Sequence, residues 1–452
     1  METSPEIGSL FSPERRKIRK SVWKIAIPVM LANLTIPLVG LADTAVMGRL
    51  DHAYYIGGVA MGSFVFSLIT VVFGFQRMAT TGLVAQAFGA GDRNAIFHHL
   101  YQGVTVALAL GLGIILLSYP VIIVAKTMLT ASPQVLDGMA EYISIIAYSG
   151  PAICLNMVAL GMLFGLQKVR YCMIQMMVLN ITNIALNLYF VLGLGMKIEG
   201  VALASVLAQY TGLFVSAILV VRSLGLWREF PKYRMNAVLA LGPLARYASL
   251  GANLTIRTLC IIMGEVLVLN ASGAMSDEAL AASQLGFVIF GLMAYGLDGF
   301  AHAVEALVGE AIGKKDALTL RRAILESTIL AAMTALLTSA VIAVTSSAFL
   351  HFMTDIPEVI TAAEDIYFWI IIMPVVSIWA FQMDGVFIGA TKAVIMRNSL
   401  LLSMAVFIPL LYIAQSYAGL NGVWFAFNVL LALRGLTLWL KKGEVEKEAT
   451  SS

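Results

Sequence analysis

The stretch VWKIAIPVMLANLTIPLVGLADTAVM, residues 22–47, decides the fold class. It is almost entirely apolar, and as a helix it is long enough to cross the hydrocarbon core of a membrane. Because such a run exceeds the apolar core of a signal peptide, we expect it to remain in the protein as a membrane span. The run reads as one long helix with a single acidic residue, Asp43.

The composition of the whole chain is typical of a membrane protein. Of its 452 residues, 60% are hydrophobic and 12% are charged, with a mean hydropathy of +0.89. Soluble domains carry about 25% charged residues. The net charge of +3 does not indicate nucleic-acid binding, because most basic residues lie in short loops between apolar runs. Cys154, Cys172 and Cys260 lack metal-binding spacing, so we expect no metal site and no disulfide framework.

Eleven further apolar runs predict an all-α polytopic membrane protein with twelve transmembrane helices. Polar breaks such as GAGDRN, LQKVR and MTDIPE separate the runs. The expected spans are 22–47, 55–80, 95–125, 137–165, 170–195, 200–222, 243–270, 279–306, 319–350, 358–389, 394–416 and 420–440.

The distribution of Lys and Arg predicts the orientation. Cytoplasmic loops of membrane proteins carry an excess of these residues. If both termini are cytoplasmic, the outer loops hold only Arg49, Lys126 and Lys197, and nearly all other basic residues lie inside. We therefore expect a multi-pass protein of a bacterial cytoplasmic (inner) membrane with both termini in the cytoplasm.

Short motifs recur in the same order in both halves of the chain. The matching pairs are ANLTI at 32–36 and 252–256, LVAQAFGAGD at 83–92 and LVGEAIGKKD at 307–316, and GLQK at 165–168 and GATK at 389–392. Because the spacing between partners is nearly constant, the chain contains an internal duplication. Each half holds six spans, an even number, so both halves share one orientation and form a parallel repeat.

This repeat predicts two six-helix lobes with a central cleft, an arrangement that suits alternating access. The expected boundaries are 1–222 for the N-terminal lobe, 223–242 for a cytoplasmic linker and 243–452 for the C-terminal lobe. A duplicated scaffold without a transport role is the alternative.

Asp43 is the first candidate functional residue, because an ionisable group inside a span is costly and by default functional. A poorly hydrated cavity favours the neutral form of a carboxyl group, so Asp43 could bind and release a proton. Asn180, Asn183 and Asn187 share one helix face in the fifth span and could bond to Asp43 or to a hydrated ion. Ser205 in the sixth span could join them. An interfacial Asp and asparagines that only pack helices together are the alternatives.

The second half carries its own charges within predicted spans. These are Arg257, Glu265, Asp298, Glu305 and Asp384. Arg257 is the expected cationic partner, although the sequence does not decide which acid it faces, and a structural ion pair is as compatible as a coupling role. In the first span, Pro28 and Pro37 favour a kink, because proline removes an intrahelical hydrogen bond; static curvature is the alternative.

Motifs for ATP-driven transport or hydrolysis are missing. The stretch GEAIGKK, 309–315, fails the P-loop spacing, and neither HExxH nor GxSxG occurs. We therefore expect no enzyme activity and no cofactor, and an ion gradient as the energy source.

Three stretches resemble the multidrug and toxic compound extrusion (MATE) family. They are ADTAVMGRL at the end of the first span, TTGLVAQAFGAGD at the end of the second and AYGLDGFAHAVEALVGEAIGKKD in the eighth, and the last is similar to its DNA-damage-inducible (DinF-like) branch. The resemblance implies an antiporter that expels amphipathic cations, with Asp43 as the coupling residue beside Asn183, Asn187 and Ser205. Many relatives carry Asp where this chain has Asn187, which puts a two-carboxylate site in doubt.

The sequence thus predicts a secondary antiporter that exports amphipathic, mainly cationic compounds in exchange for protons, with Asp43 as the protonation switch. Sodium coupling is one alternative, and a flippase for lipid-linked precursors is another. A flippase would need a cleft with several basic residues, whereas only Arg77, Arg257 and Arg434 lie within spans. Expected partners are small amphipathic cations and the lipid bilayer, and we expect a monomer.

Overall fold

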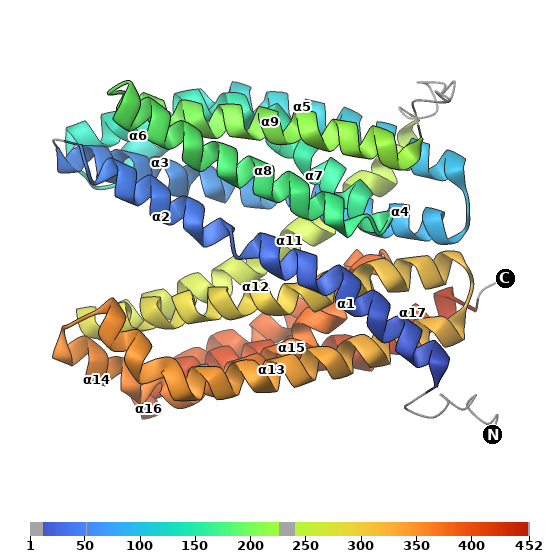
Figure 1. Cartoon of the computed structure of the whole chain (residues 1–452). Coiled ribbons are helices and arrows are strands. Elements are labelled where there is room, and N and C mark those ends of the chain that lie inside the picture. Colours follow the sequence, from blue (N-terminus) through green and yellow to red (C-terminus); the bar gives the residue numbers. More distant parts are fainter. Residues whose placement is uncertain (1–11, 51, 226–239, 451–452) are drawn as a thin grey trace. The chain divides into compact units, whose positions relative to one another are not determined.

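The computed structural model describes residues 12–50, 52–225 and 240–450. These described residues form helices joined by short turns and contain no strand (Figure 1). The helices are α1 (Pro13–Asn33), α2 (Ile36–Met47), α3 (Ala53–Val72), α4 (Phe75–Gly89), α5 (Arg93–Met128), α6 (Pro133–Ile146), η1 (Ala147–Ser149), α7 (Gly150–Gly165), α8 (Val169–Asn187), η2 (Leu188–Gly193), α9 (Ile198–Leu224), α11 (Leu241–Gly273), α12 (Asp277–Gly313), α13 (Ala317–Met353), α14 (Pro357–Asp365), α15 (Tyr367–Gly389), α16 (Ala393–Leu440) and α17 (Lys442–Glu448).

The described ranges contain 11 helical stretches that are long and apolar enough to cross a membrane. The last of them, Ala393–Glu448, contains both of the final predicted spans, 394–416 and 420–440. Within it Gly419 has a φ of 54° and a ψ of −134°, so α16 consists of two helices joined at this residue. The predicted all-α, polytopic, twelve-span fold class is therefore confirmed.

The first span is two helices, where the sequence suggested one. The helical ladder stops between α1 and α2 at Leu34 and Thr35, and the Thr35 hydroxyl donates to the carbonyl of Ala32 at 2.6 Å. Pro37 stands in the first turn of α2, where its missing N–H costs no hydrogen bond. Pro28 lies inside α1, which remains helical around it. The break thus precedes Pro37 and leaves Pro28 within a continuous helix.

The repeated motifs fold into matching turns in both halves. Gly91 and Lys315, which precede the aspartate of each GAGD or GKKD motif, have φ values of 69° and 56°. The next residues, Asp92 and Asp316, each accept a hydrogen bond from the backbone N–H three residues on and so cap α5 and α13. The duplication is therefore visible in backbone conformation as well as in sequence.

The chain divides into two compact units. Unit 1 comprises Met1–Met30, Gly89–Gly91 and Ala252–Ser452, and unit 2 comprises Leu31–Phe88 and Asp92–Gly251. Most of α1 is thus grouped with the C-terminal helices, whereas α2 is grouped with the N-terminal ones. The predicted lobe boundaries and the cleft between the lobes stay predictions, and most of the predicted linker lies outside the described residues.

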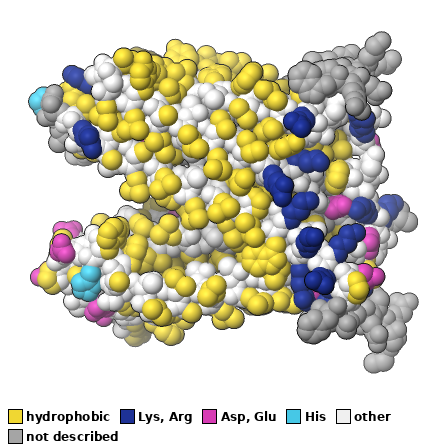
Figure 2. Space-filling model, in the orientation of Figure 1, with side chains coloured by type: hydrophobic (Ala, Val, Ile, Leu, Met, Phe, Trp, Pro, Cys, Tyr) yellow, Lys and Arg dark blue, Asp and Glu magenta, His cyan; other side chains and the backbone are white. Residues whose placement is uncertain are grey.

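Basic side chains gather at one end of each unit. On the face shown in Figure 2, most Lys and Arg side chains of unit 1 lie at the end where α1 begins. Those of unit 2 gather where α8 begins, with a few at its opposite end. Exposed apolar side chains cover the surface between these ends, as expected for helices that face lipid.

Candidate functional site

Asp43 lies on α2, in the short helix that follows the break in the first span. Its side chain is half-buried. The Asn187 side-chain amide, at the end of α8, donates a hydrogen bond to Asp43 Oδ1. The structure thus brings the carboxylate of Asp43 into contact with the fully buried side-chain amide of Asn187.

The three asparagines of α8 form a continuous polar face against neighbouring helices. Asn187 Nδ2 is 3.2 Å from Asn183 Oδ1, and Asn183 Nδ2 donates to Ser205 Oγ on α9 at 2.9 Å. At the other end of the face, Asn180 Nδ2 donates to Thr35 Oγ1 at 2.5 Å. All of the sequence-predicted residues of the N-terminal site therefore lie in one region of unit 2. Asn180 contacts the helix break rather than Asp43.

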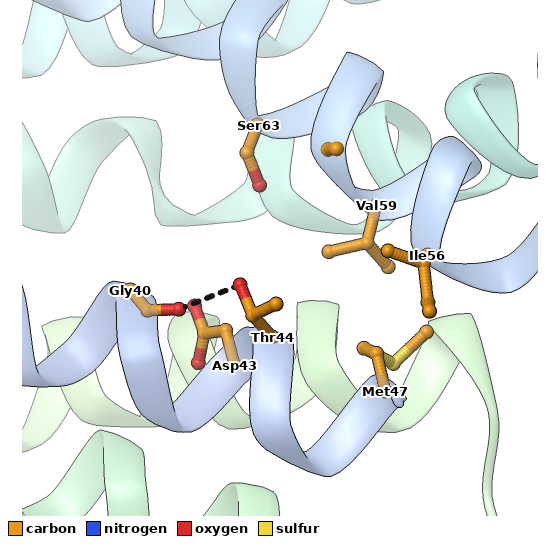
Figure 3. Close-up of a pocket in the computed structure, with 8 residues that line it drawn as sticks. Gly40, Asp43, Thr44, Met47, Ile56, Val59 and Ser63 are labelled. Atoms are coloured by element: carbon orange, nitrogen blue, oxygen red, sulfur yellow. Dashed lines mark hydrogen bonds between the residues drawn. The ribbon is translucent and has the colours of Figure 1, made fainter. Parts of the chain in front are cut away.

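A pocket of about 190 Å³ opens beside Asp43 between α2 and α3. Figure 3 shows Asp43 and Thr44 on α2 facing Ser63 on α3, with apolar side chains at one end of the space. The Thr44 hydroxyl donates to the carbonyl of Gly40 at 2.9 Å, so it is already engaged within its own helix. Asp43 therefore provides the carboxylate of a small, mixed polar and apolar pocket.

Three residues that contribute here were not singled out from the sequence. Thr35 bonds Asn180, Ser63 lines the pocket, and the buried Tyr142 of α6 lies near Asp43. Thr35 and Ser63 are common residue types in apolar runs and carry no spacing signal. Tyr142 could have been found only by knowing that α6 packs against α3, because the two helices are far apart in the sequence.

The volume of the pocket decides what it can hold. Drug-sized ligands occupy pockets of roughly 300–1,000 Å³, and 190 Å³ is below that range. A proton, a water molecule or a small cation fits. An asparagine amide donates to an ionised carboxylate through its NH₂ group, and after rotation its carbonyl oxygen accepts from a protonated one. Asn187 can therefore stabilise Asp43 in either protonation state.

In unit 1, Asp384 is the centre of a second buried group of charges. Its Oδ2 accepts hydrogen bonds from Arg257 on α11 and from Arg434 on α16. All three side chains are at least nine-tenths buried, with exposed fractions of 7 to 8%. Arg257, the cationic partner expected from the sequence, thus faces Asp384. The sequence places the second arginine, Arg434, within a span but does not indicate which acid it contacts.

The other candidate acids of unit 1 have interactions of their own. Glu265 and Asp298 interact electrostatically with Arg434. Glu305 accepts from or donates to His302 at 3.1 Å on its own helix, α12. Asp298 and Glu305 both lie on α12.

The hydroxyl of Ser205 offers a test of the asparagine face. We expect Ser205→Ala to slow transport about 2- to 10-fold, because Asn183 loses one hydrogen bond worth roughly 0.5–1.5 kcal/mol while its bond to Asn187 remains. Ser67→Ala is the matched control, since that hydroxyl bonds only the Phe64 carbonyl of its own helix among the described residues. Equal rates for both variants would show that the bond between Asn183 and Ser205 does not affect transport.

Comparison with known proteins assigns the family. The MatE family model matches residues 28–189 and 255–413, one segment in each repeat. DNA damage-inducible protein F of Escherichia coli is 36% identical over 93% of this chain and 91% of its own length. The probable multidrug resistance protein NorM of Thermotoga maritima is 23% identical over 96% and 94%.

Solved structures agree on the fold. The Vibrio cholerae MATE transporter VcmN in the bent form superimposes with a TM-score of 0.85 at 17% identity, covering 97% of this chain and 99% of the other. At that identity the likeness concerns the fold alone, whereas the family match and the Escherichia coli relative rest on sequence. The chain therefore belongs to the MatE family, as a multi-pass membrane protein similar to its DNA damage-inducible protein F.

Proposed function

We propose that this protein is a secondary antiporter that exports amphipathic, mainly cationic compounds in exchange for protons, with Asp43 as the protonation switch. The family supports the transport class, and relatives such as the Thermotoga maritima protein are named for multidrug resistance. The observation that carries the proposal is the bond from the buried Asn187 amide to Asp43, the acid that lines a pocket smaller than drug-binding pockets.

Proton coupling requires that the exported cation and the proton favour different conformations. Antiport follows when each ligand binds one of two states more tightly, because a ligand with equal affinity for both states shifts neither. Since the pocket of about 190 Å³ is too small for a drug, we assign it to the ion in this conformation. The exported compound would bind in a larger space of another conformation.

Sodium is the rival coupling ion, and one observation favours it. The buried Oδ1 of Asn187 has no hydrogen-bond partner among the described residues, so it could ligate a cation together with Asp43. Hard cations such as sodium prefer several oxygen ligands, and a single carboxylate with one free amide oxygen makes an incomplete set. A proton needs only the carboxylate and an acceptor, and so it remains our proposal.

The basic end of each unit supports a cytoplasmic location for both termini in a bacterial inner membrane. Arg257 and Arg434, which both lie within spans, already bind Asp384, which leaves little basic charge for the phosphates that a lipid-precursor flippase would handle. The exporter reading is therefore preferred. We further propose a monomer that works within the lipid bilayer without a cofactor or a nucleic-acid partner.

The test is efflux of a fluorescent cationic dye from proteoliposomes. A pH gradient and a sodium gradient of equal size are imposed separately, with protein-free liposomes as the background. We expect the pH gradient to drive dye movement and the sodium gradient to leave it at background. Dye movement under the sodium gradient alone would overturn proton coupling, and movement under neither would overturn the antiporter.

A further inference from the structure

Glu326 on α13 is a buried acid with two basic partners on α1. Its side chain is 0% exposed, and its two carboxylate oxygens accept hydrogen bonds from Arg15 and Arg19. The Arg15 side chain is 4% exposed. A third ion pair lies one turn before Glu326 on α13, where Arg322 donates to Glu14 on α1 at 2.5 Å. We call these five residues the α1 clamp.

The apolar face of α1 extends the same attachment within unit 1. Val22, Ile25, Ala26 and Val29 are at most 3% exposed and recur at helical spacing. Gly299 on α12 permits the close approach, because a Cβ atom there would lie 2.8 Å from the carbonyl oxygen of Ala26. The first half of the first span is therefore held to α12 and α13 by packing and by ion pairs.

The second half of the same span is attached to different helices. Thr35 bonds Asn180 and Asp43 bonds Asn187, both on α8 in unit 2. Between the two attachments the helical ladder is interrupted at Leu34 and Thr35. The first span thus carries an anchor in each unit, with its break between them.

We propose that Glu326 is a positioning residue for transport, which holds the first half of the first span to unit 1 through Arg15 and Arg19. This inference rests on the proposed function, because it gives a role to the helix that carries Asp43. The first span is interrupted between α1 and α2. A change in the protonation of Asp43 on α2 can therefore act on unit 1 through this span only if α1 is fixed to unit 1. Packing alone lets a helix slide or rotate, whereas a buried carboxylate with two fixed arginines defines one position.

The variant Glu326→Gln removes the charge and keeps the size of the side chain. We expect the maximal rate of dye export to fall about tenfold, which lies within the effects that substitutions between two coupled sites have on their coupling. The KM for dye should stay unchanged, because the Glu326 side chain is fully buried and so does not contact a bound dye. Glu446→Gln is the matched control: it breaks the ion pair of Arg321 with α17 at 2.8 Å, next to the clamp on α13, and should export at the wild-type rate.

A charge exchange separates positioning from mere folding. Glu326→Arg alone should fail, and its combination with Arg15→Glu should recover most of the lost rate, because the pair is re-formed with reversed sign. Rates are taken per amount of folded protein. A Glu326→Gln variant that exports at the wild-type rate would overturn the proposal, as would a double variant no better than Glu326→Arg.

A distance measurement makes failure of the proposed function distinguishable. Spin labels at Lys20→Cys on α1 and Leu337→Cys on α13, both exposed, report the position of α1 by pulsed electron paramagnetic resonance after replacement of the three native cysteines. We expect a narrow distance distribution in wild type and a broad one with Glu326→Gln. Identical distributions would overturn the clamp. Absence of dye export by wild type would instead overturn the proposed function, whatever the distances show.

Discussion

Asp43→Asn is expected to reduce dye export driven by a pH gradient to the level of protein-free liposomes, while the protein remains folded and inserted. The amide is nearly the same size as the carboxyl group and can still bond the Asn187 side chain, so the local packing persists. It cannot bind or release a proton, and without a difference in protonation between conformations the gradient has nothing to act on. Export measured in proteoliposomes tests this loss.

The control for this variant is Asp137→Asn on α6. Asp137 is an exposed acid of the same unit that pairs with Lys126 at 2.6 Å, and its side chain is 74% exposed. The same chemical change there should leave export unaltered. Wild-type export by Asp43→Asn would exclude Asp43 as the coupling residue.

Among the variants described, Asp384→Asn is expected to lower the free energy of unfolding most. It removes the negative charge that both Arg257 and Arg434 contact, and it leaves two guanidinium groups close together in a buried site. Breaking a buried ion pair from one side costs roughly 3–5 kcal/mol. The variant should therefore melt several degrees below wild type in a thermal-shift assay.

The exposed pair of Asp137 and Lys126 again provides the comparison, because surface ion pairs contribute only about 0–1 kcal/mol. Equal melting temperatures for Asp384→Asn and Asp137→Asn would contradict a structural role of the buried charges. If Asp384→Asn melts lower and still exports dye with proton coupling, the group in unit 1 holds helices together and does not couple ions.

Helical spacing and the cost of buried charge act locally, so the sequence alone could single out Asp43 and the asparagine face, whose functional role stays a prediction. Asn183 and Asn187 fall on one face by their spacing, and one carboxylate among apolar residues is conspicuous. The pairing of Asn187 with Asp43, and of Asn183 with Ser205, was expected only as a possibility, since spacing on one helix does not determine which neighbour it faces.

Contacts between distant helices lay beyond the sequence. The spacing rules do not report that Arg434 joins Arg257 at Asp384, nor that α1 packs in one unit and α2 in the other. Pro28 and Pro37 predict a kink in the first span, whereas the helix is interrupted at Leu34 and Thr35. The Thr35 hydroxyl bonds the Ala32 carbonyl there, and such a bond leaves no periodic signal in the sequence. Glu326 could have been singled out from the sequence, because it is an acid within the predicted span 319–350 and the criterion that singled out Asp43 applies to it equally.

The most direct test of the central claim is proton release on dye binding. Purified protein in weakly buffered detergent solution, at a pH where Asp43 is protonated, is mixed with the cationic dye, and a pH indicator reports the protons released. Because binding of the two ligands is reciprocal, a dye that favours the ionised state must expel the proton of Asp43. Wild type should release about one proton per bound dye, and Asp43→Asn should release none. Equal release by both proteins, or none by wild type although dye binds, would contradict it.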